Sequence, residues 1–203
     1  MKIICFGRNY ADHAKEMKSE LPTAPIFFLK PDTALLKDGN AFYYPEFTKD
    51  LHYECELVVQ IQKVGKNIAE KFATKYYSKV TLGIDFTARD LQQNCKEKGL
   101  PWEIAKAFEH SAPISNKFIE ISSLDFENLT FELYKNGEKV QTGRASDMLF
   151  SIDKLITYVS QFMTLKTGDL LFTGTPSGVG PVQIGDKLEG FLNSEKMFEF
   201  NIR

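Results

Sequence analysis

The sequence contains few cysteines and no long apolar run. Its three cysteines, Cys5, Cys55 and Cys95, lie far apart and form no Cys-x-x-Cys pair, so neither a disulfide framework nor a zinc knuckle fits. No apolar stretch approaches the roughly 20 residues of a membrane-spanning helix. The first residues, Met-Lys-Ile-Ile-Cys-Phe-Gly, enter a strand pattern without the long apolar segment of a signal peptide. We therefore expect a cytoplasmic protein with no membrane partner.

A basic stripe is also missing. The 25 lysines and arginines and the 27 aspartates and glutamates are interspersed, and the formal net charge is -2. Nucleic-acid binding relies on clustered positive charge that neutralises phosphates, so nucleic acid is not an expected partner. Hydrophobic residues make up 43% of the 203 residues, which excludes a disordered chain and predicts a single folded domain over residues 1–203.

The order of apolar patterns predicts an α+β protein that is mainly β. Asn136-Gly137 stands between two strand-like runs and is typical of a type I′ hairpin turn. Strands outnumber helices, and the tight turns favour antiparallel pairing in a rolled or sandwiched sheet. Strands are predicted at residues 2–6, 26–29, 51–59, 80–86 and 170–172, and helices at 10–17, 68–79, 89–98 and after the capping residue Ser151.

Two glutamates one residue apart suggest a metal site. Side chains alternate along a strand, so Glu54 and Glu56 lie on one face and Cys55 on the other. Neighbouring carboxylates repel each other, and a hard divalent cation with oxygen ligands, Mg²⁺ or Mn²⁺, would hold them together. Asp85 ends a predicted strand and can supply a third carboxylate. The alternative is a solvated edge strand with two exposed acids.

A second polar group lies near the start of the chain. His13 and Glu16 are three residues apart and share a face of the predicted helix. A carboxylate beside an imidazole fixes its tautomer and raises its basicity, as a water-activating base requires. An ordinary surface pair is the alternative. Arg8, just before the helix, can bind a substrate carboxylate or form a surface pair.

The glycine-rich run Gly-Thr-Pro-Ser-Gly-Val-Gly-Pro at residues 174–181 follows a predicted strand. It lacks the Gly-Lys-Ser/Thr ending of a phosphate loop, and no helix pattern follows it, so a nucleotide site does not fit. The run is either a loop that directs Thr175 and backbone N–H groups at a small anion or a plain turn between strands.

Six motifs, in order along nearly the whole chain, resemble the fumarylacetoacetate hydrolase family. The resemblance is greatest to its short members, the acylpyruvases and oxaloacetate decarboxylases. It implies the rolled β-sandwich of that family with a few peripheral helices, and a homodimer. The motifs are Cys-Phe-Gly-Arg-Asn-Tyr-Ala-Asp-His at 5–13, Phe-Leu-Lys-Pro at 28–31, Tyr-Glu-Cys-Glu-Leu at 53–57, Gly-Ile-Asp-Phe-Thr-Ala-Arg-Asp at 83–90, Gly-Leu-Pro-Trp-Glu-Ile-Ala-Lys-Ala-Phe at 99–108 and Phe-Thr-Gly-Thr-Pro-Ser-Gly-Val-Gly-Pro at 172–181.

The resemblance also implies roles for individual residues. A Mg²⁺ or Mn²⁺ ion would be held by the carboxylates, and the His/Glu pair would activate water on a segment that orders over the ligand. A buried lysine would lie near the metal. By position, the metal ligands are Glu54, Glu56 and Asp85, the catalytic residues are His13, Glu16 and Lys106, and the substrate-binding residues are Arg8, Lys30, Gln92 and Thr175.

The implied activity is cleavage of a carbon–carbon bond in small acylpyruvates, 3-acyl-2-oxo acids, to pyruvate and a carboxylic acid. A 2-oxo acid can chelate a metal ion, and the same enolate arises when oxaloacetate loses CO₂. Oxaloacetate decarboxylase, tautomerase and 2-hydroxyhepta-2,4-diene-1,7-dioate isomerase are therefore alternatives. A catalytically silent protein that binds a dicarboxylate is the non-enzyme alternative.

Overall fold

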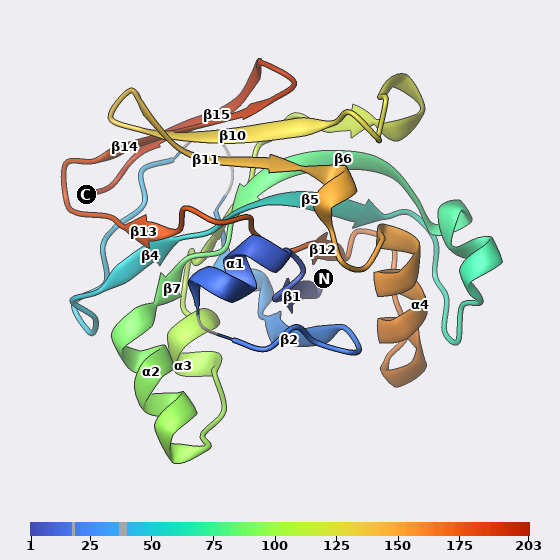
Figure 1. The fold of residues 1–203 in the computed structure, drawn as a ribbon, viewed down its shortest axis with the longest axis horizontal. Coiled ribbons are helices and arrows are strands. Elements are labelled where there is room, and N and C mark those ends of the chain that lie inside the picture. Colours follow the sequence, from blue (N-terminus) through green and yellow to red (C-terminus); the bar gives the residue numbers. More distant parts are fainter. Residues whose placement is uncertain (18, 37–39) are drawn as a thin grey trace.

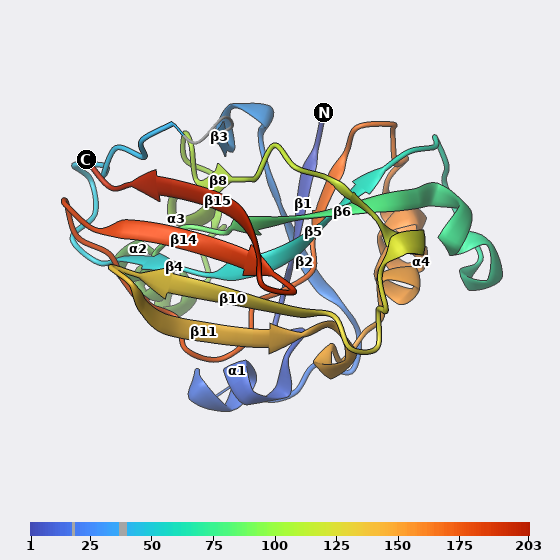
Figure 2. The same ribbon diagram turned by 90° about the horizontal axis from the view of Figure 1, so that it is seen from above.

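A large mixed sheet and a second, antiparallel sheet pack against each other in the computed structural model, which describes residues 1–17, 19–36 and 40–203 (Figures 1 and 2). In the large sheet the strand order is β2-β1-β12-β5-β6-β9, with β1 and β12 parallel and the other neighbours antiparallel. Its strands are β1 (Ile3–Gly7), β2 (Ile26–Lys30), β5 (Cys55–Ile61), β6 (Tyr77–Ile84), β9 (Ile119–Glu120) and β12 (Leu170–Phe172).

The second sheet has the order β11-β10-β14-β15 and lies across β5 and β6 (Figure 1). Two small sheets, β13-β4-β7 and β3-β8, complete the sheets of the described residues. These strands are β10 (Thr130–Lys135), β11 (Glu138–Arg144), β14 (Lys187–Leu192), β15 (Glu195–Asn201), β3 (Leu35–Leu36), β4 (Leu51–Tyr53), β7 (Thr87–Ala88), β8 (Ala112–Pro113) and β13 (Gly180–Pro181).

Helices lie around the sheets (Figure 1). α1 (Ala11–Glu16) follows β1, α2 (Arg89–Lys98) and α3 (Glu103–Lys106) contact each other, and α4 (Ile152–Phe162) begins after Ser151. The Ser151 side chain accepts the N–H of Lys154 at 3.3 Å, which confirms the predicted cap. Short 3₁₀ turns occur at Asp32–Ala34, Glu70–Tyr76, Ile121–Ser123 and Ala145–Asp147.

The period-2 pattern of β5 decides where the core lies. Cys55, Leu57 and Val59 are fully buried and belong to the large apolar cluster between the two sheets. Val58 belongs to a separate, smaller cluster, on the other face. Glu56 shares that face by alternation. The sandwich core therefore occupies one side of β5, and the carboxylates point to the side covered by the helices.

The fold expected from the sequence is confirmed, apart from one predicted element and some strand boundaries. Asn136 and Gly137 both have positive φ, 54° and 82°, as a type I′ turn requires. The helix predicted at 68–79 is wrong: the 3₁₀ turn ends at Tyr76, and β6 begins at Tyr77, earlier than predicted. The apolar residues four positions apart suggested one buried helix face, but Phe72 is 45% exposed, and the chain from Tyr77 onward pairs with β5.

Candidate active site

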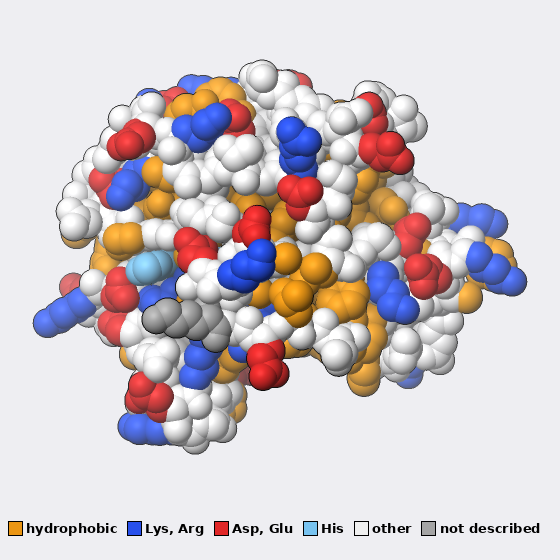
Figure 3. Space-filling model, in the orientation of Figure 1, with side chains coloured by type: hydrophobic (Ala, Val, Ile, Leu, Met, Phe, Trp, Pro, Cys, Tyr) orange, Lys and Arg blue, Asp and Glu red, His pale blue; other side chains and the backbone are white. Residues whose placement is uncertain are grey.

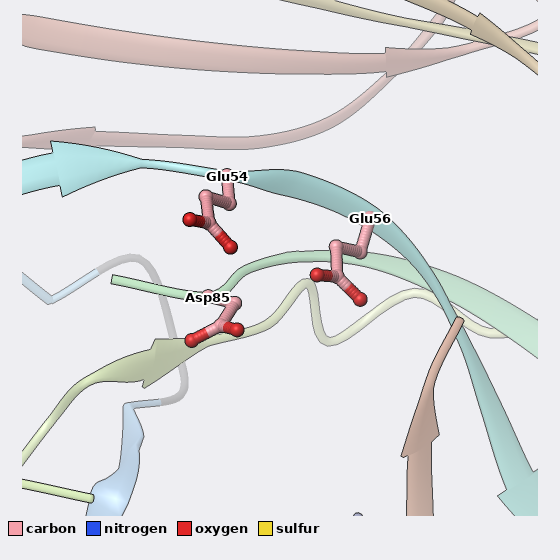
Figure 4. Close-up of side chains that lie close together, drawn as sticks. All are labelled: Glu54, Glu56 and Asp85. Atoms are coloured by element: carbon pink, nitrogen blue, oxygen red, sulfur yellow. The ribbon is translucent and has the colours of Figure 1, made fainter. Parts of the chain in front are cut away.

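Glu54, Glu56 and Asp85 converge from neighbouring strands (Figure 4). Glu54 lies between β4 and β5, Glu56 lies in β5, and Asp85 directly follows β6. The three offer carboxylate oxygens within 4.8 Å of one another, and all three residues are buried. The N–H of Asp85 donates to the carbonyl of Glu54 at 2.8 Å, which fixes the two backbones together. The shared face is thus confirmed, and the alternative of a solvated edge strand is wrong because β5 lies between β12 and β6.

Basic side chains neutralise two of these carboxylates. Lys106 Nζ lies 2.8 Å from Glu54 Oε2 and 2.8 Å from Asp85 Oδ2, while Lys30 Nζ lies 2.7 Å from Asp85 Oδ1. Arg89 Nη2 lies 2.7 Å from Glu54 Oε1. Burial alone would raise the pKa of Glu54, but Lys106 and Arg89 hold it well below its ordinary range. Burial likewise opposes the charge on Lys106, yet Asp85 and Glu54 raise the pKa of that ammonium.

Glu56 has a different environment. Its Oε2 accepts the N–H of Gly174 at 2.7 Å, and no lysine or arginine among the described residues forms an ion pair with it. Burial, Asp85 and Glu54 raise the pKa of the Glu56 carboxyl well above its ordinary value. A divalent cation would compensate this carboxylate, and three hard oxygen donors fit Mg²⁺ or Mn²⁺. The acidic triad of Glu54, Glu56 and Asp85 can therefore hold such an ion.

Gly174 must be a glycine for this contact. Its φ is 103°, and a Cβ at this position would lie 2.8 Å from the Cβ of Asn9. The loop after β12 thus passes close enough to the start of the chain to present its N–H to Glu56. The Asn9 side chain donates to the carbonyls of Thr173 and Phe150 at 2.8 and 3.1 Å, so it ties this loop to the segment that leads into α1.

α1 brings the predicted His/Glu pair over the same pocket. Nδ1 of His13 lies 3.1 Å from Oε2 of Glu16, and Gly178 donates its N–H to Glu16 Oε1 at 3.1 Å. His13 is 7% exposed and lines the pocket with the triad, whereas Glu16 is exposed at the pocket's edge. The helix is short and has no side-chain N-cap, which means that tertiary contacts hold it in place.

Eight of the ten predicted site residues line the pocket. Gln92 is buried and accepts a hydrogen bond from Arg89 Nη1 at 2.8 Å. Thr175 Oγ1 donates to the carbonyl of Cys55 at 2.9 Å and accepts from Gln141 Nε2 at 2.9 Å. The predicted residues that line it are Arg8, His13, Glu54, Glu56, Asp85, Gln92, Lys106 and Thr175, and Glu16 contacts His13 at its edge.

Lys30 lies outside the pocket. Its side chain is fully buried behind Asp85, and its Nζ also donates to the carbonyls of Ser111 and Phe86, at 2.9 and 3.3 Å. It is not part of the pocket wall. This placement does not support the expected contact with substrate, and the geometry makes Lys30 a residue that positions Asp85.

Sequence reasoning missed two basic pocket residues, Arg89 and Lys96. Both lie on α2 with Gln92, at positions i, i+3 and i+7, which form one stripe on a helix. Because Gln92 was already predicted to lie in the pocket, this spacing could have predicted that Arg89 and Lys96 lie there too.

A buried acidic triad beside a His/Glu pair on a rolled β-sandwich defines a class of metal-binding enzymes. A family model described as "Fumarylacetoacetate (FAA) hydrolase C-terminal" matches residues 2–202. The chain belongs to the fumarylacetoacetate hydrolase family, whose members are metal-dependent hydrolases and isomerases.

Relatives of this chain have related names. It is 44% identical over 200 residues to the mitochondrial oxaloacetate tautomerase FAHD1 of Bos taurus, covering 98% of this chain and 90% of that protein. The structure of fumarylpyruvate hydrolase from Pseudomonas aeruginosa in complex with Mn²⁺ and pyruvate superposes with a TM-score of 0.93 at 36% identity, covering 100% of this chain and 89% of that one. A 5-carboxymethyl-2-hydroxymuconate delta-isomerase from Mycobacterium smegmatis superposes with a TM-score of 0.87 at 32% identity, covering 99% and 78%.

Among the described residues no helix is long and apolar enough to cross a membrane. Lysine, arginine, aspartate and glutamate side chains are intermixed on the face shown in Figure 3. Because the FAHD1 relatives are named as mitochondrial, the cytoplasmic location stays a prediction.

Proposed function

We propose that this chain is a divalent-metal-dependent enzyme that forms and protonates the enolate of a small 2-oxo acid, with keto–enol tautomerisation of oxaloacetate as its principal reaction. The observation that carries the proposal is the buried His13, which lines the same pocket as the acidic triad and contacts Glu16 at the pocket's edge. A protein that only binds a dicarboxylate needs no such pair. The names of the FAHD1 relatives support oxaloacetate as the substrate.

The proton-transferring group is His13. A carboxylate only accepts hydrogen bonds, so Glu16 fixes the proton of His13 on Nδ1 and leaves Nε2 as the base. Nε2 takes a proton from C3 of the keto form, and the resulting imidazolium delivers it to the C2 oxygen to give the enol. Ketonisation runs the same two proton transfers in reverse. Gly178 holds Glu16 through its N–H, so the imidazole keeps its orientation. When held by the triad, Mg²⁺ or Mn²⁺ supplies a Lewis acid for the carbonyl oxygen of the substrate.

The charges of the site favour a dianion. The acidic side chains of the triad are matched in number by the basic side chains that contact them, Lys30, Lys106 and Arg89. A divalent ion therefore leaves an excess of positive charge. Oxaloacetate carries two carboxylates and offsets more of this excess than a monocarboxylate does.

Hydrolysis of acylpyruvates is the second candidate, and the same pair supports it. His13 Nε2 can take a proton from water instead of from carbon, and the hydroxide then attacks the distal carbonyl, with pyruvate enolate as the leaving group. The name of the Pseudomonas aeruginosa fumarylpyruvate hydrolase adds support. Decarboxylation of oxaloacetate gives the same enolate without an activated water.

One substrate panel tests the proposal. Purified protein is assayed with enol-oxaloacetate, keto-oxaloacetate and acetylpyruvate, each with Mg²⁺, with Mn²⁺ and with EDTA. We expect metal-dependent tautomerisation to be the fastest reaction. Hydrolysis of acetylpyruvate at a greater kcat/KM would make the chain an acylpyruvase instead. No turnover of any substrate, with retained dicarboxylate binding, would contradict the enzyme proposal.

A homodimer and a cytoplasmic location belong to the same proposal. The homodimer is expected from the family resemblance alone, and sedimentation equilibrium measures it directly. Fractionation of the source cells tests the location.

A further inference from the structure

α2 presents one polar stripe to the pocket. Arg89, Gln92 and Lys96 all line it, and their spacing places them on one face of the helix. Arg89 is occupied, because its guanidinium contacts Glu54 and Gln92 at 2.7 and 2.8 Å. An α-helix rises 1.5 Å per residue, so the backbone of Lys96 lies about 10 Å along the axis from that of Arg89. Lys96 therefore marks the end of the stripe that is remote from the acidic triad.

Lys96 has no acidic partner. Its Nζ lies 5.9 Å from the centre of the Trp102 ring, and no ion pair involves it among the described residues. Burial, Arg89 and Arg8 lower the pKa of this ammonium by more than the charge of Glu54 raises it. The positive charges of the pocket wall thus repel one another, and an anion placed among them would relieve that repulsion.

Arg8 is the other basic side chain of the wall without an acidic partner. It lines the pocket and is half-buried, and no ion pair of the described part of the chain includes it. Its φ of 58° lies in the left-handed region, which is uncommon for a residue with a side chain and clusters at functional sites. Two unpaired cations, one before α1 and one on α2, line the same pocket.

From the position of these two unpaired cations in the pocket wall we infer that Lys96, with Arg8, forms a subsite for a second carboxylate at the end of a 2-oxo acid. The substrate class is then a 2-oxo acid whose far end is charged, in preference to one with a neutral acyl group. The inference rests on the proposed function in one respect, because it takes the 2-oxo carboxylate end to lie at the triad. Lys96 is a specificity-determining residue in this arrangement and takes no part in proton transfer.

Binding tests the subsite without any need for turnover. The ligands are 2-oxoadipate and its ω-amide, which have the same length and shape and differ in the charge of the far end. Calorimetry measures both on the Mn²⁺-loaded protein. We expect the parent protein to bind the diacid more tightly, and Lys96→Met to reduce the diacid-to-amide affinity ratio about fivefold, the scale of a partly exposed ion pair.

Two control variants define the result. Lys98→Met removes an exposed lysine of the same helix that does not line the pocket, and it should leave the ratio unchanged. Lys96→Arg keeps the charge and should retain the preference. The ratio of the parent should also fall as salt is raised from low to physiological concentration.

Several outcomes would overturn the subsite. The first is that the parent protein shows no preference for the diacid, and the second is that the diacid does not bind. The third is that Lys96→Met lowers the affinity for both ligands equally. The last would mean that Lys96 supports the pocket through its packing on Trp102. The proposed function is tested by different outcomes from those that test the subsite. A protein that shows the charge-dependent binding but turns over no substrate would keep the subsite and lose the enzymatic assignment, and an active enzyme without the preference would do the reverse.

Discussion

Gly174 donates its N–H to Oε2 of Glu56 at 2.7 Å, and this is the hydrogen bond that the buried carboxylate receives. Glu54 and Asp85, in contrast, both contact Lys106. The acidic triad is therefore asymmetric, with two carboxylates neutralised by the protein and one left for a cation. This asymmetry makes specific predictions for the two halves of the site.

The first prediction concerns Glu56 and pH. Its folded-state pKa is raised by burial and by Asp85 and Glu54. The folded-state pKa therefore lies above the unfolded-state value of about 4.3. Below that pH, the contribution of the protonated Glu56 carboxyl to the stability of the metal-free fold is fully present. The stabilisation is lost as pH rises through the folded pKa. We expect the free energy of unfolding in EDTA to fall with pH in the parent relative to Glu56→Gln, as measured in urea. Parallel pH profiles for the two proteins would contradict the raised pKa.

The second prediction concerns Lys106. Lys106→Met removes the ammonium that contacts Glu54 and Asp85 and leaves two buried carboxylates with less compensation. Breaking a buried ion pair from one side typically costs about 3–5 kcal/mol. We expect a lower melting temperature in EDTA, partly restored by Mg²⁺, and a loss of turnover. Lys98→Met is the matched control. A variant as stable as the parent in EDTA would show that the ion pairs are not maintained in solution.

The third prediction separates the reactions through His13. His13→Ala should lower tautomerisation and acylpyruvate hydrolysis by roughly 10²–10⁴-fold, as expected for loss of a general base. Decarboxylation of oxaloacetate should suffer less, because it needs no proton abstraction. Steady-state kinetics on the three reactions measure this. Equal losses on all three would mean that His13 acts by closing or shaping the pocket.

The fourth prediction concerns Arg89. Its guanidinium helps to keep the pKa of Glu54 low, second to Lys106 among the basic groups. Arg89→Met should raise that pKa, so that protons compete better with the metal ion. We expect the midpoint pH of Mn²⁺ binding, followed by calorimetry, to move upward. Arg144→Met, an exposed arginine at the end of β11, provides the control. An unchanged midpoint would remove Arg89 from the control of metal affinity.

The sequence predicted the Glu54/Glu56 half of the triad because the strand period survives a break in the strand. Glu54 lies outside both β4 and β5, yet Glu54 and Glu56 still share a face. The burial of the pair was not predictable from this pattern, since Glu-x-Glu by itself is more typical of an exposed edge. Burial depends on the neighbours β12 and β6, which are distant in sequence.

Lys30 shows where position in a motif is insufficient. Its place in the Phe-Leu-Lys-Pro motif of the family resemblance suggested a pocket residue, but its side chain lies behind Asp85, toward the carbonyls of Phe86 and Ser111. Arg89 and Lys96 were missed for the opposite reason. A helical stripe can be recognised in the sequence, but which way the stripe faces depends on how α2 packs against α3 and the sheets.

Titration of metal into chelator-stripped protein tests the central claim most directly. Mn²⁺ is added in steps to the parent and to Glu56→Gln while the conversion of enol-oxaloacetate to the keto form is followed by ultraviolet absorbance. For the parent, we predict negligible activity before addition and saturation at about one ion per chain, as a single site formed by three carboxylates requires. For Glu56→Gln, we predict little or no rise over the same range. Full activity of the stripped parent, or the same rise in both proteins, would contradict the account.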